Sequence, residues 1–196
     1  MNKSVWKAMQ FVVFGWLLMC SAANARELLD VNLQEQVNID GESKPLILNG
    51  AGIRYKFIFK VYVGALYLPE KQTDANIILQ QDLPNRMMMH IVYDEVSREK
   101  LIKAWQDGFS ENNSEDVLTA LSQRLEKFNQ MFSTLQKGDE VLLDYLPETG
   151  TRVTIRGEDK GIIEGADFNH ALLAVWLGKN PVTEELKTAL LGVQQD

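Results

Sequence analysis

Arg54 is the residue whose type and surroundings most suggest chemistry. It stands between the glycine-rich stretch Asn49-Gly50-Ala51-Gly52 and the largely apolar segment Tyr55 to Leu68. Burying an unpaired ion costs several kcal/mol, so an arginine buried in such a segment needs a partner anion. The plainer interpretation, which composition alone favours, is that Arg54 points outward or pairs with an internal Asp or Glu.

Motifs for metal, cofactor and nucleophilic chemistry are missing from the sequence. There is no G-x-S-x-G, no H-E-x-x-H and no phosphate-binding glycine loop followed by Lys-Ser/Thr. The single cysteine excludes a disulfide framework and any multi-cysteine zinc or iron–sulfur site. His90 and His170 have no second histidine or cysteine three or four residues away. We therefore interpret both as structural or surface residues, and expect no metal and no cofactor.

The first residues predict export. Lys3 and Lys7 precede an apolar run from Phe11 to Met19, and Ala23-Asn24-Ala25 follows. A basic start, a short apolar run and an A-x-A site are typical of a cleavable secretory signal. Cleavage after Ala25 would leave a single domain, residues 26–196, and the two-lysine signal favours Sec export to a bacterial periplasm. An uncleaved anchor is the alternative, whereas Met19 before Cys20 argues against a lipoprotein.

The charge balance restricts the partners. The chain has 20 Lys and Arg against 27 Asp and Glu, a formal charge of −7. The sequence has no long basic run, and we therefore expect no nucleic-acid binding, because phosphate contacts need clustered positive charge. The acidity also weakens the case for docking on anionic lipid headgroups. No segment after residue 25 is apolar enough to span a membrane.

The elements that must position Arg54 follow from the apolar periodicity. Strands are predicted at 31–39, 46–48, 57–68 (one or two strands, with a kink at Gly64), 87–93, 140–146, 151–156 and 162–164. Helices are predicted after Ser97 and after Ser114 (with an apolar stripe that continues to Leu135), over 166–177 up to Gly178, and after Thr183. Grouped strands joined by hairpins indicate an α+β fold, an antiparallel sheet with helices on one face.

Two blocks of the sequence resemble a known family. Asn49-Gly50-Ala51-Gly52-Ile53-Arg54, which leads to Lys60-Val61-Tyr62-Val63-Gly64-Ala65-Leu66-Tyr67-Leu68, is similar to the chalcone isomerase family. So is Leu172 to Leu190, with Trp176-Leu177-Gly178 and Pro181. The pattern covers nearly all of residues 30–192 and resembles the exported bacterial branch. This resemblance implies an open-faced β-sandwich, a large antiparallel sheet covered by a helical layer.

The resemblance also implies roles for particular residues. Arg54 matches the arginine of the flavanone-forming enzymes, but Tyr62 stands where they carry a threonine. These enzymes also carry a Tyr and an Asn on the first helix, and the nearest positions in this sequence are Val96 and Lys103. Val175 stands where they carry a Ser or Thr. The fatty-acid-binding relatives are similar in pairing the Arg with a Tyr.

The resemblance therefore predicts a binding protein for a fatty acid or similar amphipathic carboxylate, with Arg54 and Tyr62 at the head group and no assigned catalytic residue. The alternative is an isomerase or lyase acting on an enone or phenolic substrate. A weaker one is a protein-interaction module without a cavity.

Overall fold

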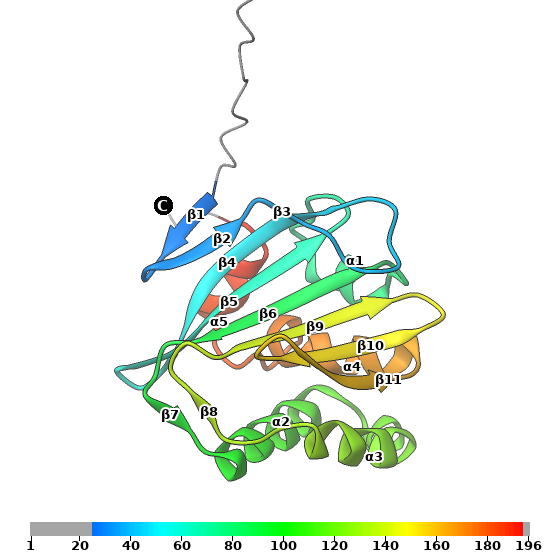
Figure 1. Cartoon of the computed structure of the whole chain (residues 1–196). Coiled ribbons are helices and arrows are strands. Elements are labelled where there is room, and N and C mark those ends of the chain that lie inside the picture. Colours follow the sequence, from blue (N-terminus) through cyan, green and yellow to red (C-terminus); the bar gives the residue numbers. More distant parts are fainter. Residues whose placement is uncertain (1–24, 194–196) are drawn as a thin grey trace, which may run out of the picture.

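A curled seven-stranded antiparallel sheet forms the centre of the molecule, with the strand order β11-β10-β9-β6-β5-β4-β3 (Figure 1). The computed structural model describes residues 25–193, so the predicted signal segment, residues 1–25, lies outside the described residues apart from Ala25. The strands are β1 (Ala25–Leu28), β2 (Val31–Gln34), β3 (Gln36–Val37), β4 (Leu46–Lys56), β5 (Phe59–Leu68), β6 (Asn85–Ile91), β7 (Glu95–Val96), β8 (Leu135–Gln136), β9 (Glu140–Leu146), β10 (Gly150–Ile155) and β11 (Glu158–Ile163). The helices are α1 (Ala75–Gln80), α2 (Arg98–Asn112), α3 (Glu115–Gln130), α4 (Ala166–Leu177) and α5 (Glu184–Leu190).

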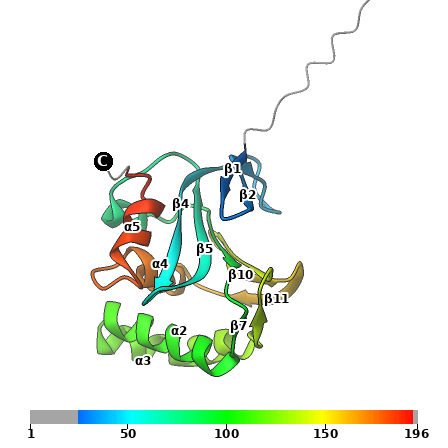
Figure 2. The same ribbon diagram turned by 90° about the vertical axis from the view of Figure 1, so that its left-hand side faces the viewer.

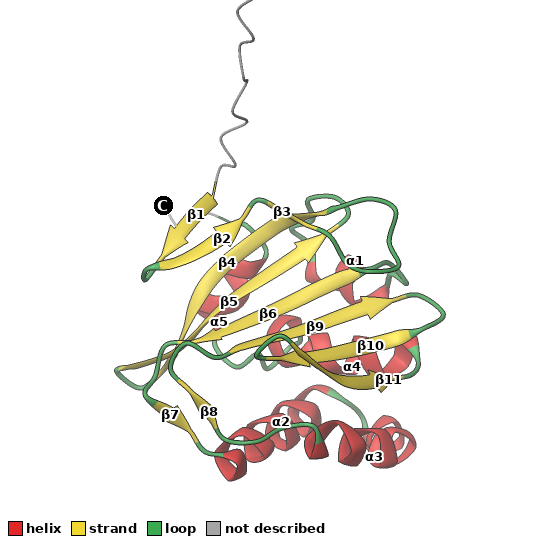
Figure 3. Cartoon of the chain, viewed as in Figure 1, coloured by secondary structure: helices red, strands yellow, loops and turns green. Residues whose placement is uncertain are grey.

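The two faces of the sheet carry different layers. All five helices contribute to the larger core on one face, and Figures 2 and 3 show them gathered on that side and below the sheet. The β1–β2 hairpin packs on the other face and forms a smaller core with it. Strand β5 serves both cores, because Leu66 faces the helices whereas Val63 and Ala65 face the hairpin, as the alternation of a strand requires. The predicted α+β open-faced sandwich is confirmed.

The glycine-rich stretch from Asn49 to Gly52 lies within strand β4. Strand β4 runs unbroken from Leu46 to Lys56, and helix α5 packs directly across it. A Cβ atom added to Gly52 would lie 2.6 Å from the Cβ of Ala189 on α5, and one added to Gly50 would meet the α5 backbone. The glycines therefore let a helix approach the strand closely, which is one of the uses of glycine within a sheet.

Several element boundaries differ from the sequence prediction. The segment 31–39 splits into β2 and β3, which belong to different sheets. Strand β5 is a single strand whose pairing continues through Gly64, opposite Gly52 and Met89. The missing side chain of Gly64 leaves room for Leu186 and Met87.

The helices show similar differences. The apolar periodicity does not predict the helix at Ala75–Gln80, where Asp74 caps α1 by accepting a hydrogen bond from the Asn76 N–H. Helix α3 ends at Gln130, and Leu135 continues the apolar stripe from strand β8. Gly178 ends α4 as predicted, but with a φ of −69°, so it needs no left-handed conformation; its lack of a side chain makes room for Asn112.

Candidate ligand-binding cavity

The β4–β5 hairpin brings Arg54 and Tyr62 together. The two strands are joined by a two-residue turn at 57–58, and Arg54 on β4 lies directly opposite Tyr62 on β5 in the register. The register shifts immediately after Arg54, between Arg54 and Tyr55, so the hairpin bulges there. Bulges often re-aim a side chain at a site. Arg54 and Tyr62, which the resemblance paired, are therefore cross-strand neighbours in the folded chain.

Tyr62 is held by a buried hydrogen bond from helix α4. The Trp176 Nε1–H donates to the Tyr62 hydroxyl oxygen over 2.8 Å, and both side chains are almost fully buried. Because an indole nitrogen only donates, the Tyr62 hydroxyl accepts in this bond and keeps its own proton for another partner. Burial raises the pKa of Tyr62 from 10.0 to about 12, although the charge of Arg54 and the bond from Trp176 act in the opposite direction. Tyr62 is therefore a protonated donor at neutral pH.

Arg54 has a half-buried side chain without a carboxylate partner. Its guanidinium carbon lies 5.9 Å from the centre of the Tyr62 ring, within the range of a cation–π contact. Among residues 25–193, no Asp or Glu lies within ion-pair distance of Arg54. Neither arrangement of the plainer interpretation is found, because Arg54 borders a cavity and has no internal acid beside it.

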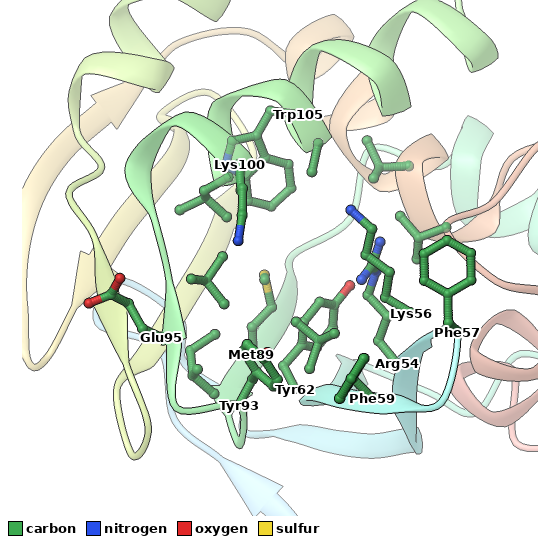
Figure 4. A pocket seen from close by; sticks show the side chains of 17 residues that line it. Arg54, Lys56, Phe57, Phe59, Tyr62, Met89, Tyr93, Glu95, Lys100 and Trp105 are labelled. Carbon is green, nitrogen blue, oxygen red and sulfur yellow. The ribbon is translucent and has the colours of Figure 1, made fainter.

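A cavity of about 210 Å³ opens beside Arg54 and Tyr62. Its wall is mostly apolar, and Figure 4 shows Arg54 and the Tyr62 hydroxyl directed into the same space. Strands β4 to β6 form one side and helix α2 the other. The lining residues are Arg54, Lys56, Phe57, Phe59, Val61, Tyr62, Met89, Ile91, Tyr93, Glu95, Val96, Lys100, Leu101, Ala104, Trp105, Val175 and Val182. The sequence alone does not separate these residues from the ordinary core.

An aromatic cluster lies beside this cavity and includes Trp105 of its lining. Trp105 on α2 meets Trp176 on α4 edge to face at 5.6 Å between ring centres, and Phe128 on α3 at 5.3 Å. Such pairs contribute stability beyond their buried area. Because Trp176 also holds Tyr62, the cluster ties the polar end of the site to three helices.

A second, more polar hollow of about 300 Å³ adjoins the cavity. The two share Arg54, Lys56 and Lys100, so the cationic groups stand at the border between an apolar and a polar space. Lys103 also lines the hollow, but forms an exposed ion pair with Asp107 at 2.8 Å. Sequence reasoning missed Lys56 and Lys100, because surface lysines carry no distinguishing signal. The only available signal was the position of Lys56, two residues after Arg54 and so on the same face of a strand.

The positions that the resemblance compared with catalytic groups do lie around these spaces. Val96 and Val175 line the apolar cavity, and Lys103 lines the polar hollow. Two apolar side chains thus stand near positions where the enzymes carry polar groups.

The histidines lie outside the cavity lining. His90 is on β6 opposite Val63, which belongs to the core on the hairpin face. The Nε2 atom of His170 lies 3.1 Å from the carbonyl oxygen of Gln81. Within residues 25–193, no group of three or more His, Cys, Asp or Glu side chains is placed to hold a metal ion.

Comparison with known proteins now identifies the fold. The family model described as chalcone isomerase-like matches residues 25–192, most of the chain. The chain belongs to the chalcone isomerase-like family. This confirms the resemblance drawn from the glycine block and the Trp176 segment.

A solved relative of this chalcone isomerase-like protein has a similar fold. The crystal structure of an Arabidopsis thaliana fatty-acid binding protein matches it with a TM-score of 0.65 and 14% sequence identity, over 86% of this chain and 96% of that chain. No protein with a curated description matches the chain at a significant level. Among the described helices, none is long and apolar enough to cross a membrane.

Proposed function

We propose that this chalcone isomerase-like protein binds a fatty acid or a similar amphipathic carboxylate without transforming it. The observation that carries the proposal is Arg54, a half-buried cation with no acidic partner among the described residues, at the polar end of an apolar cavity. A ligand carboxylate supplies the missing anion, and the ligand tail occupies the cavity. The Arabidopsis relative, which has the same fold, is a fatty-acid binding protein, and this supports the ligand class.

The head-group interaction follows from the donors available. The Arg54 guanidinium presents a planar pair of N–H groups that match a carboxylate, and such charge-assisted bonds are stronger than neutral ones. The Tyr62 hydroxyl adds its free proton, because Trp176 already satisfies its oxygen. Lys56 and Lys100 contribute further positive charge at the same border.

The tail supplies most of the affinity. Burying twelve carbons contributes roughly 10 kcal/mol at about 0.8 kcal/mol per methylene, and association costs at least about 4 kcal/mol. With this lowest cost and a head-group bond of about 1.5–3 kcal/mol, the net binding free energy reaches about 8–9 kcal/mol, which corresponds to micromolar binding. The cavity, about 210 Å³, is smaller than the roughly 300–1,000 Å³ of pockets for drug-sized ligands. We therefore expect laurate to bind more tightly than stearate.

A catalytic role is less well supported by the site. A general base for enone chemistry needs a pKa near the working pH, whereas burial raises the pKa of Tyr62 to about 12. Val96 and Val175 offer no polar group to a substrate. Chalcone turnover that disappears in Arg54→Gln would replace this proposal by the isomerase alternative. A pure protein-interaction module gives no reason for a cavity beside Arg54.

Calorimetric titration of residues 26–196 with laurate tests the binding proposal. The Arg54→Gln variant should bind about 10- to 100-fold more weakly, because it loses a charge-assisted bond worth about 1.5–3 kcal/mol. Arg156→Gln is the matched control, since Arg156 follows β10 and lies outside the cavity lining. Equal laurate affinities for the two variants would rule out Arg54 as the head-group residue, and no laurate binding by the parent protein would rule out the function.

The proposal includes location. The signal pattern of residues 1–25 supports Sec export and a periplasmic, bacterial setting for residues 26–196. Mass spectrometry of the protein recovered from a periplasmic extract should give a chain that begins at Arg26. Recovery of the full-length chain from the membrane fraction would instead establish an uncleaved anchor.

A further inference from the structure

The turn between β4 and β5 exposes an unusual concentration of large apolar side chains. Within residues 25–193, five of the nine exposed large hydrophobic residues lie at this end of the sheet. We name them the aromatic tip: Tyr55, Phe57, Ile58, Phe59 and Tyr93. Phe57 and Ile58 are 89% and 84% exposed, and Phe59 contacts Tyr93 edge to face at 5.7 Å between ring centres. Contiguous exposed apolar surface of this kind marks an interaction site.

The conformation of the turn does not explain these residues. Phe57 has a φ of 56°, in the left-handed region that two-residue hairpin turns normally fill with glycine or asparagine. An aromatic residue there is strained, and such strain clusters at functional sites. The tip is therefore costly both in backbone conformation and in exposure.

Positive charge surrounds the aromatic tip. Lys56 lies between Tyr55 and Phe57 in the chain and Lys60 follows Phe59, while Arg54 and Lys100 line the cavity next to the tip. Two acidic side chains are also near: Asp94 follows Tyr93 and is exposed, and Glu95 borders the cavity and accepts a hydrogen bond from Gln136. Four basic residues therefore stand against two acidic ones. The chain as a whole carries −7, so this region has a local charge opposite to that of the molecule.

We propose that the aromatic tip inserts into the surface of an anionic lipid bilayer and places the cavity mouth against it. Aromatic side chains with neighbouring lysines suit the membrane interface, where the rings enter the headgroup region and the lysines contact lipid phosphates. Phe57 and Phe59 belong to both the aromatic tip and the cavity lining, so an inserted tip leaves a continuous apolar path from bilayer to cavity. The net negative charge of the chain argues against contact with anionic headgroups, but the basic residues around the aromatic tip give this region the opposite charge. The purpose of this docking, ligand exchange, rests on the proposed function, but the docking itself does not.

Vesicle sedimentation of residues 26–196 tests the docking, because this part of the chain contains every residue of both cores. We expect binding to phosphatidylcholine vesicles that contain about one-third phosphatidylglycerol, and weaker binding to phosphatidylcholine alone. Ile58→Glu should reduce binding to the anionic vesicles by about tenfold or more. Leu83→Glu is the matched control, since Leu83 is 45% exposed and precedes β6 at the opposite end of the sheet. Its binding should not change.

Insertion itself has a direct spectroscopic readout. Cys20 is the only cysteine of the sequence, so residues 26–196 contain none. An environment-sensitive dye on Ile58→Cys should shift to the blue on adding anionic vesicles, whereas the same dye on Leu83→Cys should not. Ile58 is outside the cavity lining, so Ile58→Glu should still bind laurate normally.

The outcomes separate docking from ligand binding. Vesicle binding without laurate binding would refute the proposed function alone. Laurate binding by a parent protein that ignores anionic vesicles, or equal vesicle binding by Ile58→Glu and Leu83→Glu, would overturn the docking. A dimer in solution that Ile58→Glu dissociates, with no vesicle binding, would assign the aromatic tip to self-association and also overturn it.

Discussion

Replacing Tyr62 by phenylalanine tests how the cavity is held and how its head-group end works. The substitution keeps the ring and removes the oxygen that accepts the hydrogen bond from Trp176 Nε1 over 2.8 Å. Trp176 is 1% exposed, and the Tyr62 hydroxyl is the acceptor that its Nε1–H has in the structure. A buried donor left without a partner costs about 1–3 kcal/mol, and we expect the free energy of unfolding to fall by that amount.

The expected loss is large enough to measure in two ways. Urea unfolding followed by tryptophan fluorescence gives the free energy directly. In a domain of this size, each kcal/mol corresponds to about 2–4 °C of melting temperature, so the midpoint should fall by about 2–12 °C. Tyr55→Phe is the control, because Tyr55 is 41% exposed and lies outside the cavity lining. Its unfolding free energy should stay within about 0.5 kcal/mol of the parent value.

A double-mutant cycle with Trp176→Phe isolates the bond. Trp176→Phe alone also leaves space in the core, but the coupling energy between the two substitutions should report the Tyr62–Trp176 contact, at about 1 kcal/mol. Tyr62→Phe should in addition weaken laurate binding about tenfold, because the free phenolic proton no longer reaches the carboxylate. A parent-like stability for Tyr62→Phe with no coupling to Trp176 would refute the bond and the free donor inferred from it.

Two further predictions concern the framework and the pH dependence. Gly52→Ala should lower the free energy of unfolding by about 1–3 kcal/mol, because the new Cβ would lie 2.6 Å from the Cβ of Ala189. In urea titrations, adding Ala189→Gly should restore part of this loss. If the effects of the two substitutions simply add, the close approach of α5 is not the cause. Alkaline unfolding should reflect Tyr62, whose pKa rises from 10.0 to about 12 on folding. Between these values the unfolded chain loses the proton and the folded chain keeps it, so stability falls as the pH rises, by about 3 kcal/mol for this group. The stability gap between the parent and Tyr62→Phe should therefore narrow over that range, and a constant gap would contradict the raised pKa.

Local pattern predicted most of the elements correctly. Ser97 and Ser114 cap α2 and α3, accepting hydrogen bonds from the Lys100 and Val117 N–H groups, as their positions before apolar periodic segments indicated. Strands β9 and β10 agree with the prediction to within one residue, since turn residues and alternation are local signals. Strand β11 begins at Glu158, four residues before the predicted start. Other features depend on a distant partner. The packing of Gly64, for example, involves Leu186, more than a hundred residues later.

The candidate site divides in the same way. The pairing of Arg54 with Tyr62 was within reach, because the resemblance named both residues and a hairpin brings close neighbours in sequence together. The hydrogen bond from Trp176 spans 114 residues and was not within reach. Lys100 and Trp105 were not within reach either, because helix α2 meets the β4–β5 hairpin only in the folded chain.

The amino-acid sequence by itself determined the fold class, the family and the two residues of greatest chemical interest, because these depend on periodicity, turn chemistry and motif. Only the tertiary structure decided whether the apolar residues near Arg54 form solid core or enclose a cavity. Both arrangements use the same side chains at the same spacing, and the difference is a gap left between α2 and the sheet. The same holds for the aromatic tip, where Phe57, Ile58 and Phe59 form a typical apolar strand pattern in sequence. They are exposed because the chain turns at 57–58 beyond the reach of any layer that would cover them.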